Sequence, residues 1–145
     1  MSDESKPASG PGAAAPTAAA PRAIVAGHGE FGAGLVSAVE QITGRGAQLV
    51  PIAVHKLGVE AIEDLLRERM AAEHVHVIFT DLQAGSCTMA SRRILRGMPD
   101  AVLVAGANLP MLLDFVFSDG ADPAGAARHA AERGRAAITA HGGSA

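Results

Sequence analysis

One histidine stands between two glycines directly after a short apolar run. The run is Ala23–Ala26, and Gly27, His28 and Gly29 follow it. Glycine has no side chain that could shield the imidazole, so a reactant can reach His28 from solvent. Neutral imidazole is a good nucleophile near neutral pH, because its unperturbed pKa is about 6.5. We therefore predict that His28 is a nucleophile rather than a structural histidine.

A carboxylate follows a second apolar run in the same way. Asp81 comes directly after Val75–Thr80. A carboxylate that accepts the N–H of one ring nitrogen fixes the tautomer in which the other nitrogen attacks. Asp81 is the predicted orienting partner of His28, and the alternative is that it caps the helix that follows.

Two expected helix N-termini offer hydrogen-bond donors for an anion. One helix begins after Gly29, and the other begins around Gly85, Ser86 and Cys87. Free backbone N–H groups and the positive end of a helix dipole favour phosphate, and phosphoryl transfer depends mainly on positioning and electrostatics. The predicted phosphate-binding residues are Gly29, Gly85, Ser86 and Cys87, although Ser86 could equally serve as a helix cap. This chemistry needs no metal or other cofactor, and none is expected.

Three further residues, Cys87, Asn108 and Glu30, are open to more than one interpretation. Cys87 is the only cysteine, so no disulfide forms within the chain; we favour a packing role for its side chain over redox sensing. Asn108 is expected to shape a turn rather than to contact a ligand. Glu30 places a carboxylate beside His28, and we hypothesise that its charge raises the transfer potential of a phosphorylated His28.

Apolar runs and stripes at helical spacing alternate along the chain. Strands are expected at Ala23–Ala26, Ala47–Val54, Val75–Thr80 and Ala101–Ala105, with a last short strand at Ala136–Ala140. Helices are expected over Phe31–Ile42, Val59–Met70, Ala90–Met98, Met111–Phe117 and Pro123–Arg133. Nearly all-apolar strands between helices predict an α/β fold, with a doubly wound, mostly parallel sheet covered on both faces. Ligands bind at the carboxyl ends of such strands, so His28 and Asp81 are expected to meet there.

Composition limits the remaining classes of function. Residues 1–21 are rich in Ala and Pro, which predicts a disordered tail before one folded domain at residues 22–145. The net charge of −3 and the absence of Trp and Tyr argue against nucleic acid as a partner. No apolar run approaches the roughly 20 residues of a membrane helix, and the N-terminus lacks a secretory h-region. We expect a cytoplasmic protein.

Three segments together resemble one bacterial family. Ile24–Gly29 resembles the active-site strand of the mannose-family enzyme IIA domains of the sugar phosphotransferase system (PTS). Phe79–Leu82 with Gly85 and Ser86 resembles that family's second active-site loop, usually an aspartate, two residues, then Gly-Gly-Ser/Thr-Pro. Ala105–Leu113 resembles its Gly-x-Asn-x-Pro-Met-Leu segment. The three segments come in the family's order, and the resemblance covers about residues 23–140.

The resemblance implies a phosphocarrier that accepts a phosphoryl group on His28 from the protein HPr. It further implies transfer to an enzyme IIB partner, sugar uptake through a membrane permease, and a homodimer that exchanges its last, possibly antiparallel, strand. The sequence departs from the family pattern at Gln83, Ala84 and Cys87. Three alternatives stay open: a regulatory protein whose phosphorylation controls binding to another target, a relay to a kinase of a small metabolite such as dihydroxyacetone, and an anion-binding domain without a covalent step.

Overall fold

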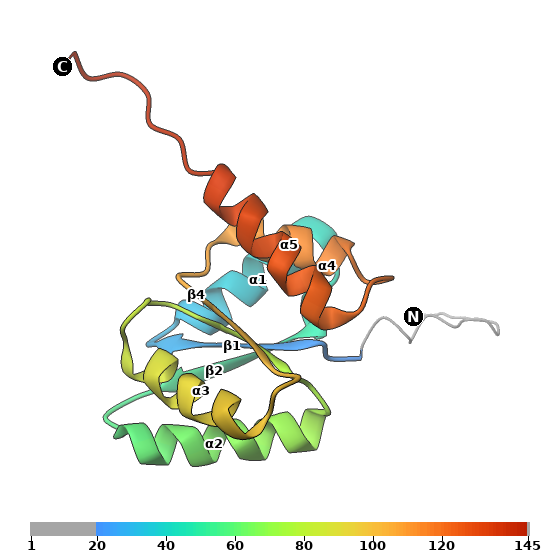
Figure 1. Cartoon of the computed structure of the whole chain (residues 1–145). Coiled ribbons are helices and arrows are strands. Elements are labelled where there is room, and N and C mark those ends of the chain that lie inside the picture. The colour runs from blue at the N-terminus through green and yellow to red at the C-terminus, as the bar shows by residue number, and fades with distance from the viewer. Residues whose placement is uncertain (1–19, 145) are drawn as a thin grey trace, which may run out of the picture.

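The structure is a computed structural model that describes residues 20–144. In this range strands and helices alternate along the chain (Figure 1). The strands are β1 (Ala23–His28), β2 (Leu49–Val54), β3 (Val77–Thr80) and β4 (Val102–Ala105). The helices are α1 (Phe31–Thr43), α2 (Val59–Glu73), α3 (Ser86–Gly97), α4 (Leu109–Phe117) and α5 (Pro123–Ala136), with one 3-10 turn, η2 (Gly46–Gln48), before β2.

The four strands form one parallel sheet in the order β2-β1-β3-β4. From β1 the chain crosses to β2 on one side, and it later returns to place β3 and β4 on the other side. The sheet is thus the doubly wound α/β sheet that the sequence predicts. Its topological switch point lies between β1 and β3, the position at which doubly wound sheets generally bind ligands.

Each face of the sheet is covered by its own set of helices. Ile24 and Ala26 of β1 pack in one core with α2 and α3, whereas Ala23 and Val25 pack in the other core with α1, α4 and α5. This alternation follows the two-residue period of a strand. Both cores hold large buried side chains, so the central strands that carry the site residues are fixed from two sides.

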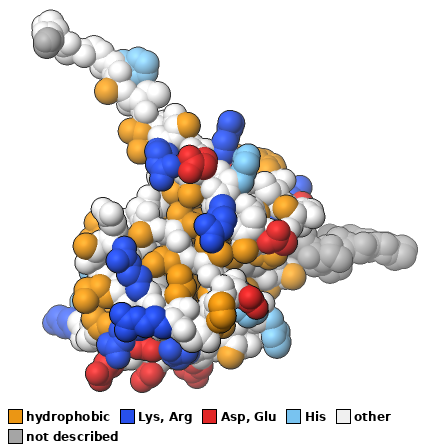
Figure 2. Space-filling model, viewed as in Figure 1, with side chains coloured by type: hydrophobic (Ala, Val, Ile, Leu, Met, Phe, Trp, Pro, Cys, Tyr) orange, Lys and Arg blue, Asp and Glu red, His pale blue; other side chains and the backbone are white. Residues whose placement is uncertain are grey.

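The exposed surface of α2 and α3 is charged. Figure 2 shows Lys and Arg side chains grouped above Asp and Glu side chains over these two helices. Glu63 of α2 pairs with Arg67, 2.8 Å away, and with Arg93 of α3, 3.0 Å away. The Glu63–Arg93 pair joins the two helices that cover one face of the sheet.

Most predicted element ends agree with the structure to within a few residues. Gly44 ends α1 in the left-handed conformation with φ of 74°, as its position after the helical stripe predicts. The strand predicted at Ala47–Val54 begins only at Leu49, because residues Gly46–Gln48 form the 3-10 turn. α3 begins at Ser86, four residues before the first residue of its predicted apolar stripe.

The last predicted strand, Ala136–Ala140, is wrong for the described single chain. Ala136 is still helical, and the residues after it extend away from the body without pairing (Figure 1). Alanine and arginine favour the helix, and Ala137 N–H still donates to the Arg133 carbonyl. Ile138 is 73% exposed, so its apolar side chain is not buried against its own chain. All strands of the described chain are parallel to one another.

The predicted tail, residues 1–21, lies outside the described residues except for its last two positions. In the part of the chain that the structure describes, no helix is both long enough and apolar enough to cross a membrane.

Candidate active site

His28 and Asp81 meet at the switch point of the sheet. His28 is the last residue of β1, and Asp81 directly follows β3, the parallel neighbour of β1. The imidazole Nδ1 lies 2.8 Å from Asp81 Oδ2, and the backbone N–H of His28 donates to the same oxygen over 2.9 Å. One carboxylate oxygen therefore accepts two hydrogen bonds from one residue, which fixes both the ring and the backbone that carries it.

This arrangement determines the tautomer of His28. Burial raises the pKa of Asp81, but hydrogen bonds from the His28 side chain and backbone outweigh burial and lower it overall. The carboxylate is therefore ionised at neutral pH and accepts a proton from Nδ1–H. The proton on Nδ1 leaves the lone pair of the neutral ring on Nε2. The His28 side chain is 58% exposed and that of Asp81 is 10% exposed, so solvent reaches the imidazole more readily than the carboxylate.

The other oxygen of Asp81 is buried and unpaired. Asp81 Oδ1 has no hydrogen-bond partner among the described residues. A buried acceptor without a partner costs free energy, typically about 1–3 kcal/mol. The carboxylate is thus held in place by His28 on one oxygen and by surrounding packing on the other.

The glycine before His28 provides room for this carboxylate. A Cβ atom at Gly27 would lie 2.7 Å from Phe31 Cδ2, 2.8 Å from Asp81 Oδ2 and 2.9 Å from Asp81 Cγ. Real Cβ atoms do not approach other heavy atoms so closely. Gly29 has a φ of +54°, a left-handed conformation that turns the chain from β1 into α1. The two glycines therefore have different roles on either side of His28.

The N-terminus of α3 lies against the imidazole. Gly85 is the residue before the helix, and a Cβ atom there would lie 3.8 Å from His28 Cε1. The first N–H groups of a helix have no acceptor within it, and the helix dipole is positive at this end. No side-chain oxygen of the residue before α3 occupies these donors. Gly85 is therefore close to the ring, and Ser86 and Cys87 follow it as the first residues of α3. Phosphate binding by these residues stays a prediction.

Comparison with known proteins connects this geometry to one family. Residues 22–131 match the family model of the PTS system fructose IIA component. That range covers more than half of the chain and includes both His28 and Asp81. The chain belongs to this family. Family membership places it in the sugar phosphotransferase system, with phosphotransferase activity as its general class. No match to the chain was found among curated proteins.

Solved structures support the assignment of this IIA-family fold. The mannose/sorbose-specific IIA subunit of the phosphotransferase system from Enterococcus faecalis matches with a TM-score of 0.75 and 20% identity, over 86% of this chain and 97% of that chain. A structure from Klebsiella pneumoniae described as a PTS permease matches with a TM-score of 0.69 and 24% identity, over 83% of this chain and 90% of that chain. The EIIA component from Streptococcus agalactiae matches with a TM-score of 0.65 and 21% identity, over 78% of this chain and 93% of that chain. At these identities the structures establish the shared fold.

The Cys87 side chain lies outside the open part of the site of this IIA-family protein. Cys87 is completely buried behind the first turn of α3. Burial, together with the negative charge of Asp81, raises the pKa of its thiol to about 11. A buried, protonated thiol reacts slowly with oxidants, which argues against redox sensing. Its packing role agrees with the favoured interpretation.

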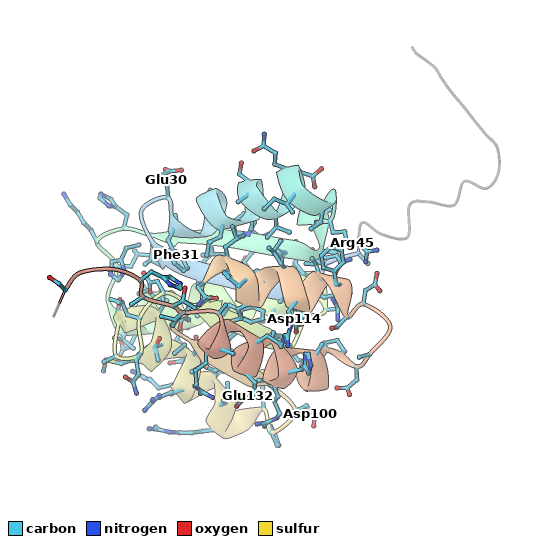
Figure 3. All side chains as sticks on the ribbon, turned by 90° about the horizontal axis from the view of Figure 1, so that it is seen from above. Glu30, Phe31, Arg45, Asp100, Asp114 and Glu132 are labelled. Carbon is cyan, nitrogen blue, oxygen red and sulfur yellow. The ribbon has the colours of Figure 1, made fainter. Side chains whose placement is uncertain are left out.

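Two further sequence candidates have clear places in the structure. The Asn108 side chain accepts a hydrogen bond from Met111 N–H over 3.0 Å and donates to the Gly134 carbonyl over 3.0 Å. It therefore caps α4 and joins it to α5, as a turn-shaping residue would. Glu30 precedes α1, and Figure 3 shows its side chain pointing away from the body of the protein. An exposed carboxylate there is well solvated, which weakens its effect on His28.

Sequence reasoning missed one pair of residues next to Asp81. The hydroxyls of Thr80 and Thr88 lie 2.6 Å apart, and both side chains are buried. Thr88 Oγ1 also donates to the Leu82 carbonyl. A buried hydroxyl in the first turn of a helix next to an active-site loop is the signal that could have revealed them. Hydroxyls on an otherwise apolar face read equally well as ordinary packing residues, so the pattern alone is weak.

Proposed function

We propose that the protein is a phosphocarrier that accepts a phosphoryl group on Nε2 of His28 and passes it to a second protein. The observation that carries this proposal is the Nδ1–Oδ2 pair, which leaves the nucleophilic nitrogen of an exposed ring at the N-terminus of a helix. In this family the donor is phospho-HPr and the acceptor is an enzyme IIB component, which serves a membrane permease. We assign the same partners to this chain.

The proposed transfer uses few groups. The lone pair of His28 Nε2 attacks the phosphorus atom, a new N–P bond forms, and the bond from phosphorus to the donor's nitrogen breaks. The donor nitrogen keeps the electron pair of the broken bond. Positive charge develops on the His28 ring, and the Asp81 carboxylate stabilises it through Nδ1–H. Asp81 remains ionised during this step.

Backbone donors would bind the transferred group. The phosphoryl oxygens carry the negative charge, and Gly85, close to the ring, leads into the first turn of α3, where the N–H groups of Ser86 and Cys87 would be donors. Gly29 adds the turn before α1, and the Ser86 hydroxyl would offer one further donor. Transfer to IIB then reverses the same bond changes, with the IIB nucleophile as the attacking group.

The surface beside His28 suits a protein partner. Leu82 and Met89 are large apolar side chains that are 54% and 52% exposed. Leu82 also borders Gly85, which adjoins the ring. An exposed His28 cannot exclude water by itself, so a docked partner must cover the site during transfer. An exposed apolar side chain close to the site, such as Leu82, is what such transient docking uses.

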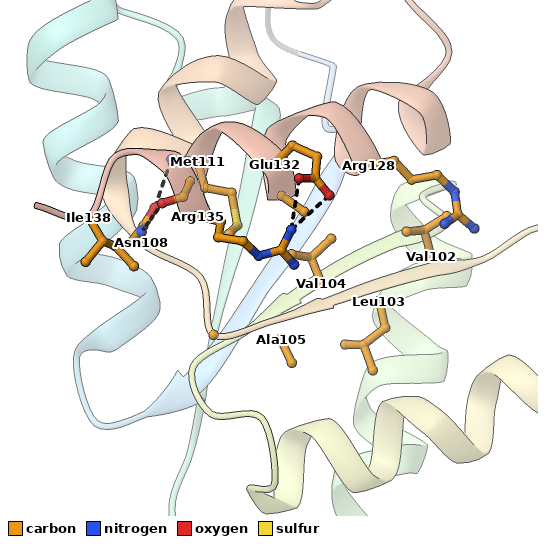
Figure 4. A pocket seen from close by; sticks show the side chains of 13 residues that line it. Val102, Leu103, Val104, Ala105, Asn108, Met111, Arg128, Glu132, Arg135 and Ile138 are labelled. Carbon is orange, nitrogen blue, oxygen red and sulfur yellow. Dashed lines mark hydrogen bonds and ion pairs between the residues drawn. The ribbon is translucent and has the colours of Figure 1, made fainter.

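A homodimer with exchanged C-terminal segments is part of the proposal. β4 is an edge strand, and a groove of about 450 Å³ runs between it and α5 (Figure 4). Val102, Val104 and Ile138 give this groove apolar walls, and the Glu132–Arg135 ion pair lies on its α5 side. We infer that residues after Ala136 of a second copy pair with β4. Sedimentation should give a dimer for the full chain and a monomer after truncation at Ala137.

The test of the phosphocarrier role is intact mass after incubation with phosphoenolpyruvate, enzyme I and HPr. The wild-type chain should gain one acid-labile phosphoryl group, and His28→Ala should gain none. His129→Ala is a matched control, because His129 Nδ1 also lies 2.7 Å from a carboxylate oxygen, that of Asp114, but outside the site. This variant should be phosphorylated like the wild type. A wild-type chain that gains no phosphoryl group would refute the role.

A second step separates transport from regulation. Purified phosphoprotein is mixed with the IIB component, and the phosphoryl group should move to IIB. Retention of the group, together with altered binding to another protein, would favour the regulatory alternative. We place the protein in the cytoplasm, where phosphoenolpyruvate supplies the phosphoryl group.

A further inference from the structure

Two buried hydroxyls hold both neighbours of Asp81 to α3. Thr80 precedes Asp81 and Leu82 follows it, and Thr88 in the first turn of α3 contacts both. Thr80 and Thr88 are 0% and 1% exposed, so water does not compete for these hydrogen bonds. The residues on both sides of Asp81 are therefore hydrogen-bonded to the same group, the Thr88 hydroxyl.

The direction of each hydrogen bond follows from the number of protons. The Leu82 carbonyl has no proton, so Thr88 must donate its single hydroxyl proton there. Thr88 has no second proton, so the Thr80 hydroxyl must donate to Thr88 Oγ1 over their 2.6 Å separation. Each hydroxyl proton thus has one acceptor: Thr80 donates to Thr88, and Thr88 donates to the Leu82 carbonyl.

The backbone before Asp81 has a second anchor. The Thr80 carbonyl accepts the N–H groups of Gly106 and Ala107 over 3.0 and 2.9 Å. These two residues follow β4, so the loop after β3 is also joined to the next strand. The Asp81 backbone is thereby held on the side of α3 and on the side of β4.

We propose that the Thr88 hydroxyl is a positioning group for phosphoryl transfer, because it couples the carboxylate that orients His28 to the helix terminus that binds the phosphoryl group. Asp81 and the α3 donors come from opposite ends of one short loop. A bond from Thr88 to the residues beside Asp81 fixes the separation of these two parts of the site. The inference rests on the proposed function of His28, but its structural core concerns the Asp81–His28 pair alone.

The test replaces Thr88 with valine, which keeps the β-branched shape and removes the hydroxyl. Thr88→Val should slow phosphorylation of His28 by roughly 10- to 100-fold, since a misplacement on the order of 1 Å near reacting groups can cost 100-fold. Thr88→Ser keeps the hydroxyl and should restore most of the rate. Thr80→Val removes only one of the two bonds and should give a smaller loss in the same direction; it also serves if Thr88→Val fails to fold.

Ser91→Ala is the matched control. Ser91 is also a buried hydroxyl of α3, and it donates to the Cys87 carbonyl over 2.7 Å without touching the loop around Asp81. Its loss should lower the melting temperature and leave the transfer rate unchanged. An equal loss of rate in Ser91→Ala and Thr88→Val would assign Thr88 to general stability and overturn the proposal.

An NMR measurement on the unphosphorylated protein separates this inference from the proposed function. The ¹⁵N shifts of the His28 ring report whether Nδ1 carries the proton and how the ring titrates. Thr88→Val should mix the two tautomers and change the pH profile, whereas Ser91→Ala should keep the wild-type signals. Unchanged ring signals in Thr88→Val would refute the positioning role, even if the wild type accepts phosphate. Changed signals with no phosphorylation of the wild type would refute only the phosphocarrier role.

Discussion

Replacement of Asp81 by asparagine removes the charge that orients His28 and retains the shape of the side chain. Asp81 Oδ2 accepts two hydrogen bonds, over 2.8 Å from the ring and 2.9 Å from the backbone. A hydrogen bond to a charged group contributes about 1 kcal/mol more than a neutral one. Only the ring bond strengthens as positive charge develops on His28, so loss of the carboxylate charge raises the barrier by about 1–2 kcal/mol, which corresponds to a roughly 5- to 30-fold slower transfer.

The asparagine amide also weakens control of the tautomer. Its nitrogen cannot accept from Nδ1–H, so a flipped amide would leave the proton on Nε2 and block the attacking lone pair. The assay is the initial rate of His28 phosphorylation by phospho-HPr, together with the ¹⁵N shifts of the ring. Asp81→Asn should show both a slower rate and a mixture of tautomers.

Asp114→Asn provides the control for this prediction. Asp114 Oδ2 lies 2.7 Å from His129 Nδ1, so this variant loses the same kind of pair on α4 and α5, outside the site. Its phosphorylation rate should equal that of the wild type. If Asp81→Asn is phosphorylated as fast as the wild type with the same tautomer, then Asp81 does not orient the nucleophile.

The remaining predictions concern residues on either side of this pair. Gly27→Ala should lower the melting temperature and slow phosphorylation, because its Cβ would lie 2.8 Å from Asp81 Oδ2; wild-type values for both would contradict the steric argument. Cys87 should resist iodoacetamide at pH 8 in the native protein and react after unfolding. Folding raises the pKa of its thiol from 9.0 to about 11, so the free energy of unfolding should decrease as pH rises between these two values, by at most about 1.4 kcal/mol per pH unit. Urea titrations at pH 8 and pH 10 test this decrease, and equal free energies of unfolding at the two pH values would contradict it. Glu30→Gln should move the equilibrium with HPr toward the phosphorylated protein, and an unchanged equilibrium would exclude an electrostatic role for Glu30.

The sheet and the His28–Asp81 pair were predictable because they depend on apolar runs that are visible directly in the sequence. Strands buried on both faces must be apolar throughout, so β1 and β3 are visible as short apolar runs. The residues that end such runs lie at the same edge of a parallel sheet. His28 and Asp81 therefore met where the sequence predicted, and glycines on both sides of His28 marked the exposed position.

Features that depend on side-chain packing were not predictable in this way. The Thr88 hydroxyl bonds to a carbonyl six residues earlier in the chain, and the sequence gives no period or spacing for such a contact. The requirement for glycine at position 27 comes from Asp81 and Phe31, one of which is distant in sequence. Local helix preference extended α5 to Ala136, and the residues around Ile138 have no partner strand in their own chain, so the predicted strand did not form.

The most direct test of the central claim is the position of phosphorus on the His28 ring. Protein with ¹⁵N-labelled histidine is phosphorylated through HPr, and ³¹P and ¹⁵N NMR identify the bonded nitrogen. The Nδ1–Asp81 hydrogen bond predicts a phosphoryl group on Nε2, with the proton retained on Nδ1. Phosphorus on Nδ1, or on a histidine other than His28, would contradict the account.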